Sequence, residues 1–287
     1  MLSYQHVFHA GNHADILKHY VLSFVLNSLN KKEKAWTFID THSGSGLYDL
    51  YDNRSRKTQE AEKGILKLLE NKSLPQELEL YLNTIKPYLE KNFYPGSPLI
   101  EKAFLRQQDI LFLSELHPAE YQNLLQAAGK EKNIKVKNQN GFYLLKEITP
   151  PVTKRGAVLI DPSYEEASDY EILSQTVNAV FKKWTNGIFM IWYPLLAHRK
   201  TEIEEMLNSI KENVYKINKN TEIADLQLCV ADKDSHIEKD LQSILDDKDK
   251  KNPPRLYGSG MLVINSPWHL KEEGQKVCEY LNGLFYR

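Results

Sequence analysis

The sequence has little of what marks secreted, membrane-bound or thiolate-metal proteins. It holds two cysteines in 287 residues, Cys229 and Cys278, and no C-x-x-C pair, which disfavours a disulfide framework and a thiolate metal site. Its longest apolar run, residues 188–197, is roughly half the length that crosses a bilayer. Polar and histidine residues occupy the first 15 positions, where a secretion signal needs an apolar core. We therefore expect a cytoplasmic protein with no membrane partner.

An excess of charge of one sign is also absent. Lys and Arg number 37 against 38 Asp and Glu, so the formal net charge is -1 and no global positive field attracts nucleic acid. Any such binding must come from a local patch. The hydrophobic share of 41% is ordinary for a globular chain, and the length allows a sizeable core. We expect a folded monomer without internal repeats.

Short apolar runs alternate with helical patterns along the chain. The runs that predict strands are residues 35–40, 110–115, 134–137, 157–161, 187–194, 224–230 and 261–265. The patterns that predict helices are residues 13–30, 120–131, 169–184, 201–213 and 271–285. This alternation predicts an α/β fold with a mostly parallel sheet that binds its ligands at the carboxyl ends of the strands. The charged segment 232–255 joins the last two strands, and we expect a long hairpin with a mobile tip there.

One interval is too long for a simple dinucleotide-binding fold. The acidic end of the second strand normally follows the glycine loop by about 20 residues, whereas Glu115 lies 69 residues after Gly46. Residues 47–94 show helical spacing, bounded by the basic run 54–57 at the start and by Tyr-Pro-Gly (94–96) at the end. We expect an inserted helical subdomain at 47–94 that serves as a substrate platform, with residues 1–46 and 95–287 forming the sheet domain.

The tetrapeptide Asp161-Pro162-Ser163-Tyr164 ends the fourth predicted strand. An exocyclic adenine amine is a poor nucleophile, and a carboxylate together with the next backbone carbonyl can accept both of its N–H bonds. Proline fixes the backbone for that carbonyl, and Tyr164 offers a face on which an extruded base can stack. An unshifted carboxylate suffices as proton acceptor, so no metal is required. The motif alone is equally consistent with an ordinary strand-to-loop turn.

Two further strand ends carry groups suited to an adenosyl ligand. Asp40-Thr-His-Ser-Gly-Ser-Gly46 follows a strand, and glycine there lets the backbone approach a ligand. It lacks the third glycine of the dinucleotide fingerprint, which disfavours a nicotinamide or flavin enzyme. Glu115 closes the next strand, where a carboxylate can accept both ribose hydroxyls. A solvated acid at a strand end is an equally simple interpretation of Glu115.

The amino-terminal segment is rich in histidine. His9 and His13, or Asp15 and His19, are four residues apart and would share a helix face, which allows a metal interpretation. No H-E-x-x-H motif completes it, and residues 11–12 would interrupt the helix. We favour polar cofactor contacts and contacts to nucleic acid, and a surface cap is the alternative.

Taken together, these motifs resemble one family. Seven occur in order: His-Ala-Gly-Asn-His-Ala-Asp (9–15), Asp-Thr-His-Ser-Gly-Ser-Gly (40–46), Tyr-Pro-Gly-Ser-Pro (94–98), Glu-Leu-His-Pro (115–118), Asn-Gly-Phe (140–142), Asp-Pro-x-Tyr (161–164) and Ser-Gly-Met-Leu-Val-Ile-Asn (259–265). The series resembles the RlmJ family of 23S ribosomal RNA adenine-N6 methyltransferases over nearly the whole chain. The resemblance implies a class I S-adenosylmethionine-dependent methyltransferase fold with a Rossmann-like, mostly parallel seven-stranded sheet and a helical insertion.

The resemblance also implies roles for particular residues. Those expected to hold S-adenosylmethionine are His19, His42, Ser97, Glu115, Asn140, Gly141 and Asp161. The expected catalytic residues are Asp161 as proton acceptor, Pro162 and Tyr164, with Tyr4 and Tyr164 on the substrate, 23S ribosomal RNA. Two positions depart from the family pattern. Ser163 replaces a proline and loosens the backbone before Tyr164, and Asn140 replaces an aspartate that carries charge.

One rival hypothesis belongs to another class of protein. A non-catalytic DNA-binding protein, involved in the use of external DNA as a nutrient, would keep the fold with a site weakened by Ser163. A nicotinamide enzyme is a third hypothesis, which the incomplete glycine pattern disfavours.

Overall fold

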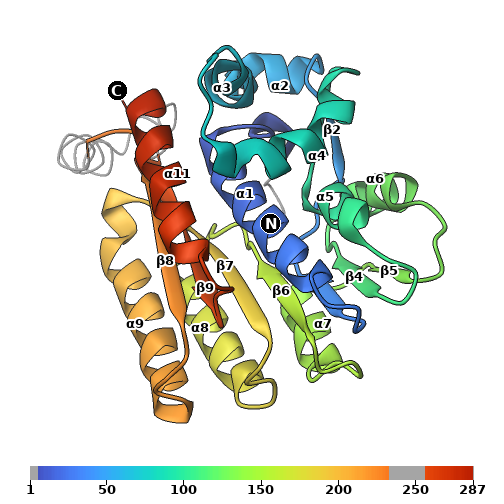
Figure 1. Cartoon of the computed structure of the whole chain (residues 1–287), viewed down its shortest axis with the longest axis vertical. Coiled ribbons are helices and arrows are strands. Elements are labelled where there is room, and N and C mark those ends of the chain that lie inside the picture. Colours follow the sequence, from blue (N-terminus) through green and yellow to red (C-terminus); the bar gives the residue numbers. More distant parts are fainter. Residues whose placement is uncertain (1–5, 233–255, 287) are drawn as a thin grey trace.

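A computed structural model of the chain describes residues 6–232 and 256–286 (Figure 1). Its centre is a seven-stranded sheet in the order β5-β4-β1-β6-β7-β9-β8. The strands are β1 (Thr37–Asp40), β4 (Ile110–Ser114), β5 (Ile134–Lys137), β6 (Gly156–Ile160), β7 (Ile188–Leu195), β8 (Ile223–Cys229) and β9 (Gly258–Ile264). Each coincides with a run predicted from the sequence. The predicted α/β class and mostly parallel seven-stranded sheet are therefore confirmed.

All pairings in the sheet are parallel except those of β9. Strand β1 lies between β4 and β6 in parallel register, and β9 runs antiparallel to both β7 and β8. The last pairing confirms the predicted hairpin of the two final strands. Most of the segment expected as its mobile tip, residues 233–255, lies outside the described residues.

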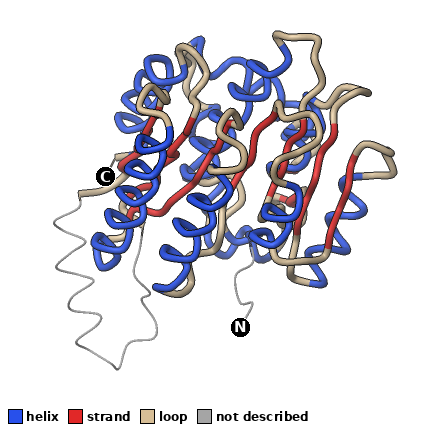
Figure 2. The backbone as a smooth tube through the Cα atoms, turned by 90° about the horizontal axis from the view of Figure 1, so that it is seen from below, coloured by secondary structure: helices blue, strands red, loops and turns tan. Residues whose placement is uncertain are grey.

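Helices cover both faces of the sheet (Figure 2). One face carries α1 (His13–Asn30), α5 (Ser97–Phe104), α6 (Pro118–Ala128) and α11 (Leu270–Phe285), and the other carries α7 (Gly141–Ile148), α8 (Ala167–Phe181) and α9 (Lys200–Ile217). Neighbouring strand residues therefore enter different cores: Phe38 packs with the first set and Ile39 with the second. This two-sided burial explains why the strands read as continuous apolar runs. The short 3₁₀ helices η1 (His6–Phe8) and η4 (Ala197–Arg199) complete this part of the chain.

The insertion after β1 is mainly helical, as the sequence predicts. It contains α2 (Asn53–Thr58), the π-helix η2 (Glu62–Leu66), α3 (Lys67–Leu69), η3 (Gln76–Leu78) and α4 (Glu79–Leu89). Its fully buried residues, among them Ile65, Tyr81 and Ile85, belong to the same hydrophobic core as α1. In Figure 1 the insertion lies above and beside the upper part of α1. The division into a sheet domain and a 47–94 subdomain stays a prediction.

The sequence patterns missed two short strands and two short helices. Strands β2 (Leu47–Asp49) and β3 (Phe93–Pro95) pair antiparallel at the two ends of the insertion. They are three residues long and far apart in the chain, so no local period marks them. Helices α5 and α7 span eight residues each, too few for a clear helical period. No helix among the described residues is long and apolar enough to span a bilayer.

The core under β1 provides a test of the fold. Phe38 is fully buried at the centre of the sheet. Phe38→Ala should lower the free energy of unfolding by about 3–5 kcal/mol, because the truncation leaves a cavity that the packed sheet cannot close. Urea unfolding followed by circular dichroism measures it. Ile172→Ala, at a position 44% exposed on α8, is the control and should change stability by less than about 1 kcal/mol. Equal losses of stability in Phe38→Ala and Ile172→Ala would contradict the burial of Phe38 in the core.

Candidate active site

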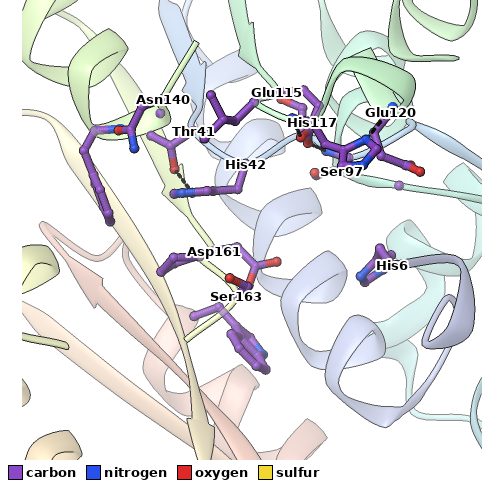
Figure 3. A pocket seen from close by; sticks show the side chains of 18 of the residues that line it. His6, Thr41, His42, Ser97, Glu115, His117, Glu120, Asn140, Asp161 and Ser163 are labelled. Atoms are coloured by element: carbon purple, nitrogen blue, oxygen red, sulfur yellow. Dashed lines mark hydrogen bonds between the residues drawn. The ribbon is translucent and has the colours of Figure 1, made fainter. Parts of the chain in front are cut away.

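A cavity of about 350 Å³ lies at the carboxyl ends of the parallel strands β1, β4 and β6. Figure 3 shows side chains from several strand ends and from the amino-terminal segment around it. Among the residues predicted to hold cofactor or substrate, those that line it are His19, His42, Ser97, Glu115, Asn140, Gly141, Asp161 and Pro162. Two predicted residues are not in this set: Tyr164 does not line the cavity, and Tyr4 lies outside the described residues.

The carboxyl end of β1 anchors the floor of this cavity. Asp40 is fully buried and accepts a hydrogen bond from Ser97 Oγ at 2.7 Å and another from the His42 backbone N–H at 3.2 Å. Burial raises the pKa of Asp40 to about 6, against the opposing effect of the Ser97 hydrogen bond. Glu101 of α5 is also fully buried, and burial together with the charge of Asp40 holds its pKa well above the usual range.

The glycine loop closes onto Glu115. Gly44 has a φ of +59° and donates its backbone N–H to Glu115 Oε2 at 2.9 Å, while Glu115 Oε1 accepts from the His117 backbone N–H at 2.7 Å. Each carboxylate oxygen keeps a lone pair for a further donor. Burial raises the pKa of Glu115, and the two backbone hydrogen bonds act against it. The carboxylate is thus fixed in place with both oxygens still able to accept.

The start of α7 is pressed against the loop after β1. A Cβ atom at Gly141 would lie 1.8 Å from the Thr41 carbonyl oxygen, so only glycine permits this approach. Asn140 caps the helix, and its Oδ1 accepts from the backbone N–H groups of Phe142 at 2.9 Å and Tyr143 at 3.3 Å. Both lone pairs of that oxygen are used. Its amide nitrogen, a donor, is therefore the group left for a ligand.

Two predicted histidines are held neutral beside the cavity. Burial lowers the pKa of His19 to about 3, and its Nδ1 lies 2.8 Å from the Tyr94 hydroxyl of the insertion. Burial also lowers the pKa of His42 to about 4, and its Nδ1 lies 2.8 Å from Thr41 Oγ1. Neither ring brings charge at neutral pH, so both act as polar, shape-defining groups.

A chain of charges reaches Asp161 from α1. Lys18 Nζ lies 2.6 Å from Asp161 Oδ2 and 2.9 Å from Asp15 Oδ1, and its side chain is 7% exposed. The second Asp15 oxygen pairs with His6 Nε2 at 2.9 Å. Burial acts to raise the pKa of Asp15, but the charges of His6 and Lys18 hold it well below the usual range. The sequence patterns did not predict this series of charged contacts. The only local signal was the i, i+3 spacing of Asp15 and Lys18.

The predicted substrate residue Tyr164 lies under the cavity instead of within it. Its side chain is 7% exposed, its hydroxyl donates to the Trp192 carbonyl at 2.6 Å, and its ring centroid lies 4.7 Å from that of Tyr170. The backbone has a φ of +51°, a left-handed conformation unusual for a bulky residue. The predicted contact with a base is therefore not available to the Tyr164 side chain as it lies here.

Trp192 of β7 lines the cavity beside Pro162 and Ser163. Its indole nitrogen is buried without a hydrogen-bond partner among the described residues. Sequence reasoning took it only as part of an apolar strand. The signal that could have found it is its place near the carboxyl end of a strand whose neighbour, β6, leads into Asp161.

The structure gives the amino-terminal histidines partners other than a metal. Asp15 pairs with His6 and Lys18, His9 Nδ1 lies 2.9 Å from Glu60 Oε1, and His19 meets Tyr94. Among residues 6–232 and 256–286, no group of three or more His, Cys, Asp or Glu side chains is arranged to hold a metal ion.

Comparison with known proteins agrees with the geometry. The family model described as Ribosomal RNA large subunit methyltransferase D, RlmJ, matches residues 33–285. The chain belongs to the RlmJ family. The resemblance predicted from the seven motifs is therefore confirmed, and S-adenosylmethionine is the methyl donor.

Similar proteins cover almost the whole chain. Proteins named Ribosomal RNA large subunit methyltransferase J from Escherichia coli K12 and Haemophilus influenzae are 36% and 38% identical to it, each over 98% of this chain and 93% of the relative. The crystal structure of protein LPL1258 from Legionella pneumophila is 32% identical, with a TM-score of 0.80 over 96% of this chain and 94% of that one. The RlmJ fold thus spans the insertion as well as the sheet.

The cavity has the groups that this RlmJ cofactor needs. A fixed carboxylate, Glu115, can accept from ribose hydroxyls, and the cavity beside it is lined by Gly44 and Gly141. The cavity volume is in the range of small-ligand sites.

Gly141 tests this assignment. Gly141→Ala should weaken S-adenosylmethionine binding about 10-fold or more, equivalent to about 1.4 kcal/mol, because α7 must move away from Thr41. Isothermal titration calorimetry measures the affinity. Gly283→Ala is the matched control, since nothing lies within 4 Å of its added methyl group, and it should bind as the unaltered protein does. Unchanged affinity for Gly141→Ala would contradict the assigned cofactor site.

Proposed function

We propose that this protein transfers a methyl group from S-adenosylmethionine to the N6 amine of one adenine in 23S ribosomal RNA. Membership of the RlmJ family supports ribosomal RNA as the substrate, against the DNA-binding alternative. One observation supports the N6 amine of adenine as the methylated group. A carboxylate and a proline carbonyl lie at the end of β6, next to an aromatic ring, and all three line the cavity that fits the cofactor. A ribosomal RNA substrate supports a cytoplasmic location.

The cofactor supplies an activated methyl group, and the residues of this chain hold it and the base. We propose that Glu115 binds the ribose of the cofactor and that the amide nitrogen of Asn140 donates to the cofactor's adenine ring. The neutral ring of His42 forms part of the wall of this site. Ser97 lines the cavity and donates its hydroxyl to Asp40, which ties the start of α5 to the end of β1. The stacked pair of His19 and Tyr94 supports one wall.

Asp161 is the proposed acceptor for the target amine. Lys18 occupies its Oδ2, which leaves Oδ1 to accept one N–H of the adenine amine, while the Pro162 carbonyl accepts the other. Accepting both N–H bonds returns lone-pair density to the nitrogen. The bound cofactor would supply the methyl group by cleavage of its carbon–sulfur bond, with a neutral thioether as the leaving group. The methylated nitrogen would then carry an acidic N–H, whose proton Asp161 would accept. Lys18 holds the carboxylate in one orientation throughout.

Trp192 is the proposed stacking surface for the base. Its ring lies in the cavity next to Pro162, whereas Tyr164 packs beneath it with a ring centroid 5.9 Å away. Tyr164 then acts by fixing the β6 loop to β7 through its hydroxyl. Ser163 restrains the backbone before Tyr164 less than a proline would, and the hydrogen bond from the Tyr164 hydroxyl to Trp192 compensates for this.

Exposed basic residues lie at two places in the fold that bear on RNA binding. Arg54 and Lys57 are exposed on α2 of the insertion, which supports the substrate-platform hypothesis, and Arg54 also pairs with Asp52. Lys182 and Lys183 follow α8 just before β7 begins, so they lie at the sheet edge opposite the cavity. This placement does not support a contact between these two lysines and a base held in the cavity.

A direct assay tests the proposal. Protein and methyl-labelled S-adenosylmethionine are incubated with total ribosomal RNA or with duplex DNA, and N6-methyladenine is mapped in the product. Label in 23S ribosomal RNA at one adenine is the expected result. Label in DNA alone, or in neither, would refute the proposal.

Asp161→Asn should lower methyl transfer by at least about 100-fold, because the amide cannot accept the proton. S-adenosylmethionine binding should stay measurable by calorimetry, since most cofactor contacts lie elsewhere. Glu204→Gln, at an exposed position on α9, serves as the matched control and should leave the rate unchanged. Undiminished transfer by Asp161→Asn would exclude the assigned role.

Trp192→Ala should lower kcat/KM for RNA by about 10- to 100-fold, since stacking contributes about 1–3 kcal/mol per base. Trp192→Phe keeps an aromatic face and should lose far less. Steady-state kinetics on the RNA substrate, with cofactor affinity as a control, distinguish the two. Equal loss in both variants would show that packing, not stacking, explains the effect.

A further inference from the structure

The amino-terminal segment, residues 6–12, is fastened to the insertion by one carboxylate. Glu60 lies between α2 and η2, and its Oε1 is 2.9 Å from His9 Nδ1. Its Oε2 accepts a hydrogen bond from Asn12 Nδ2, also at 2.9 Å. A single side chain of the insertion thus binds two side chains of the segment.

Backbone contacts reinforce this attachment on both sides of Glu60. Thr58 Oγ1 donates to the Phe8 carbonyl at 2.5 Å, and the Ile65 backbone N–H donates to the Gly11 carbonyl at 2.8 Å. A Cβ atom at Gly64 would lie 2.2 Å from that same carbonyl. The π-helix turn and its glycine therefore bring the insertion into direct backbone contact with the segment.

The amino-terminal segment is also connected to the charged residues that contact Asp161. Asn12, which binds Glu60 through its nitrogen, caps α1 by accepting from the Asp15 backbone N–H at 2.9 Å. Asp15 also accepts from the Gly11 backbone N–H and pairs with His6. Through Asp15 and Lys18 the connection continues to Asp161. A continuous set of contacts thus joins the insertion to the proposed proton acceptor.

Charge and exposure indicate a positional role for Glu60. Its carboxylate repels phosphate, so it is not itself an RNA contact. The His9–Glu60 pair is part-exposed, with side chains 39% and 31% accessible, and such pairs add little to overall stability. Burial acts to lower the pKa of His9, but the hydrogen bond and charge of Glu60 raise it overall. The His9–Glu60 pair therefore affects the position of the amino-terminal segment more than the free energy of folding.

We propose that the insertion acts as a brace for the amino-terminal segment, with Glu60 as a positioning residue for methyl transfer. By holding residues 6–12, it sets His6 in the cavity and aligns Asp15 and Lys18 with Asp161. This inference rests on the proposed function, because it assigns the insertion a part in the catalytic step in addition to any contact with RNA.

Single-turnover methyl transfer at saturating cofactor and RNA tests the brace. Glu60→Ala should lower the rate constant at least tenfold and change the RNA dissociation constant less than threefold. Glu60→Gln, whose amide can accept from Asn12 and donate to neutral His9, should restore the rate to within about threefold. Glu62→Ala, an exposed acid two residues further on, is the matched control and should equal the unaltered enzyme. A loss confined to RNA affinity, or no loss at saturation, would overturn the proposal.

Hydrogen exchange gives a readout that does not depend on RNA. Backbone amides of residues 6–12 should exchange at least tenfold faster in Glu60→Ala than in Glu62→Ala, while the central strands stay protected in both. Gly64→Ala should produce the same local change by steric displacement without altering charge. If the unaltered protein methylates no RNA, the proposed function fails, yet exchange still decides whether the brace exists. Equal exchange in all variants would overturn it.

Discussion

The active site depends on one buried ammonium group shared by two carboxylates. Lys18 lies between Asp15 and Asp161 at 2.9 and 2.6 Å, and all three side chains are less than one-fifth exposed. Charges so deeply placed are tolerated only when each is paired, and removing one partner leaves the others uncompensated. The pairing therefore forces α1, the amino-terminal segment and the end of β6 to meet at one point. The orientation of the proposed proton acceptor follows from that meeting.

Close backbone packing supplies the second constraint. Gly141 brings α7 against the loop after β1, and Gly44 brings the glycine loop within reach of Glu115. The approach at Gly44 helps to fix Glu115, whose two oxygens can each still accept a further hydrogen bond. The cavity is acidic and holds neutral histidines, so the protein has no strong positive field there. RNA affinity must then come from surfaces around the cavity, and we propose the exposed cations of α2 as one of them.

Much of the fold was predictable because its information is local. All seven strands of the main sheet and helix α1 follow from apolar periods, which each segment carries by itself. Eight of the ten site residues predicted from the sequence line the cavity, because parallel strands bring their carboxyl ends to one edge. Tyr164 was placed by its motif alone, and nothing in the motif shows that its ring turns beneath the loop to reach Trp192. The β2–β3 pair escaped for a similar reason, since three-residue strands carry no period.

The sequence by itself determined the order of elements, the presence of an insertion, the family and the identity of the acid at the end of β6. Those properties reside in short stretches whose residue types and spacing are sufficient evidence. Only the tertiary structure decided that Lys18 meets Asp161 across 143 positions of the chain, that Trp192 faces the cavity, and that Glu60 holds the amino-terminal segment. Such contacts depend on how packed elements are oriented in space, and side-chain direction is set by neighbours that are distant in sequence.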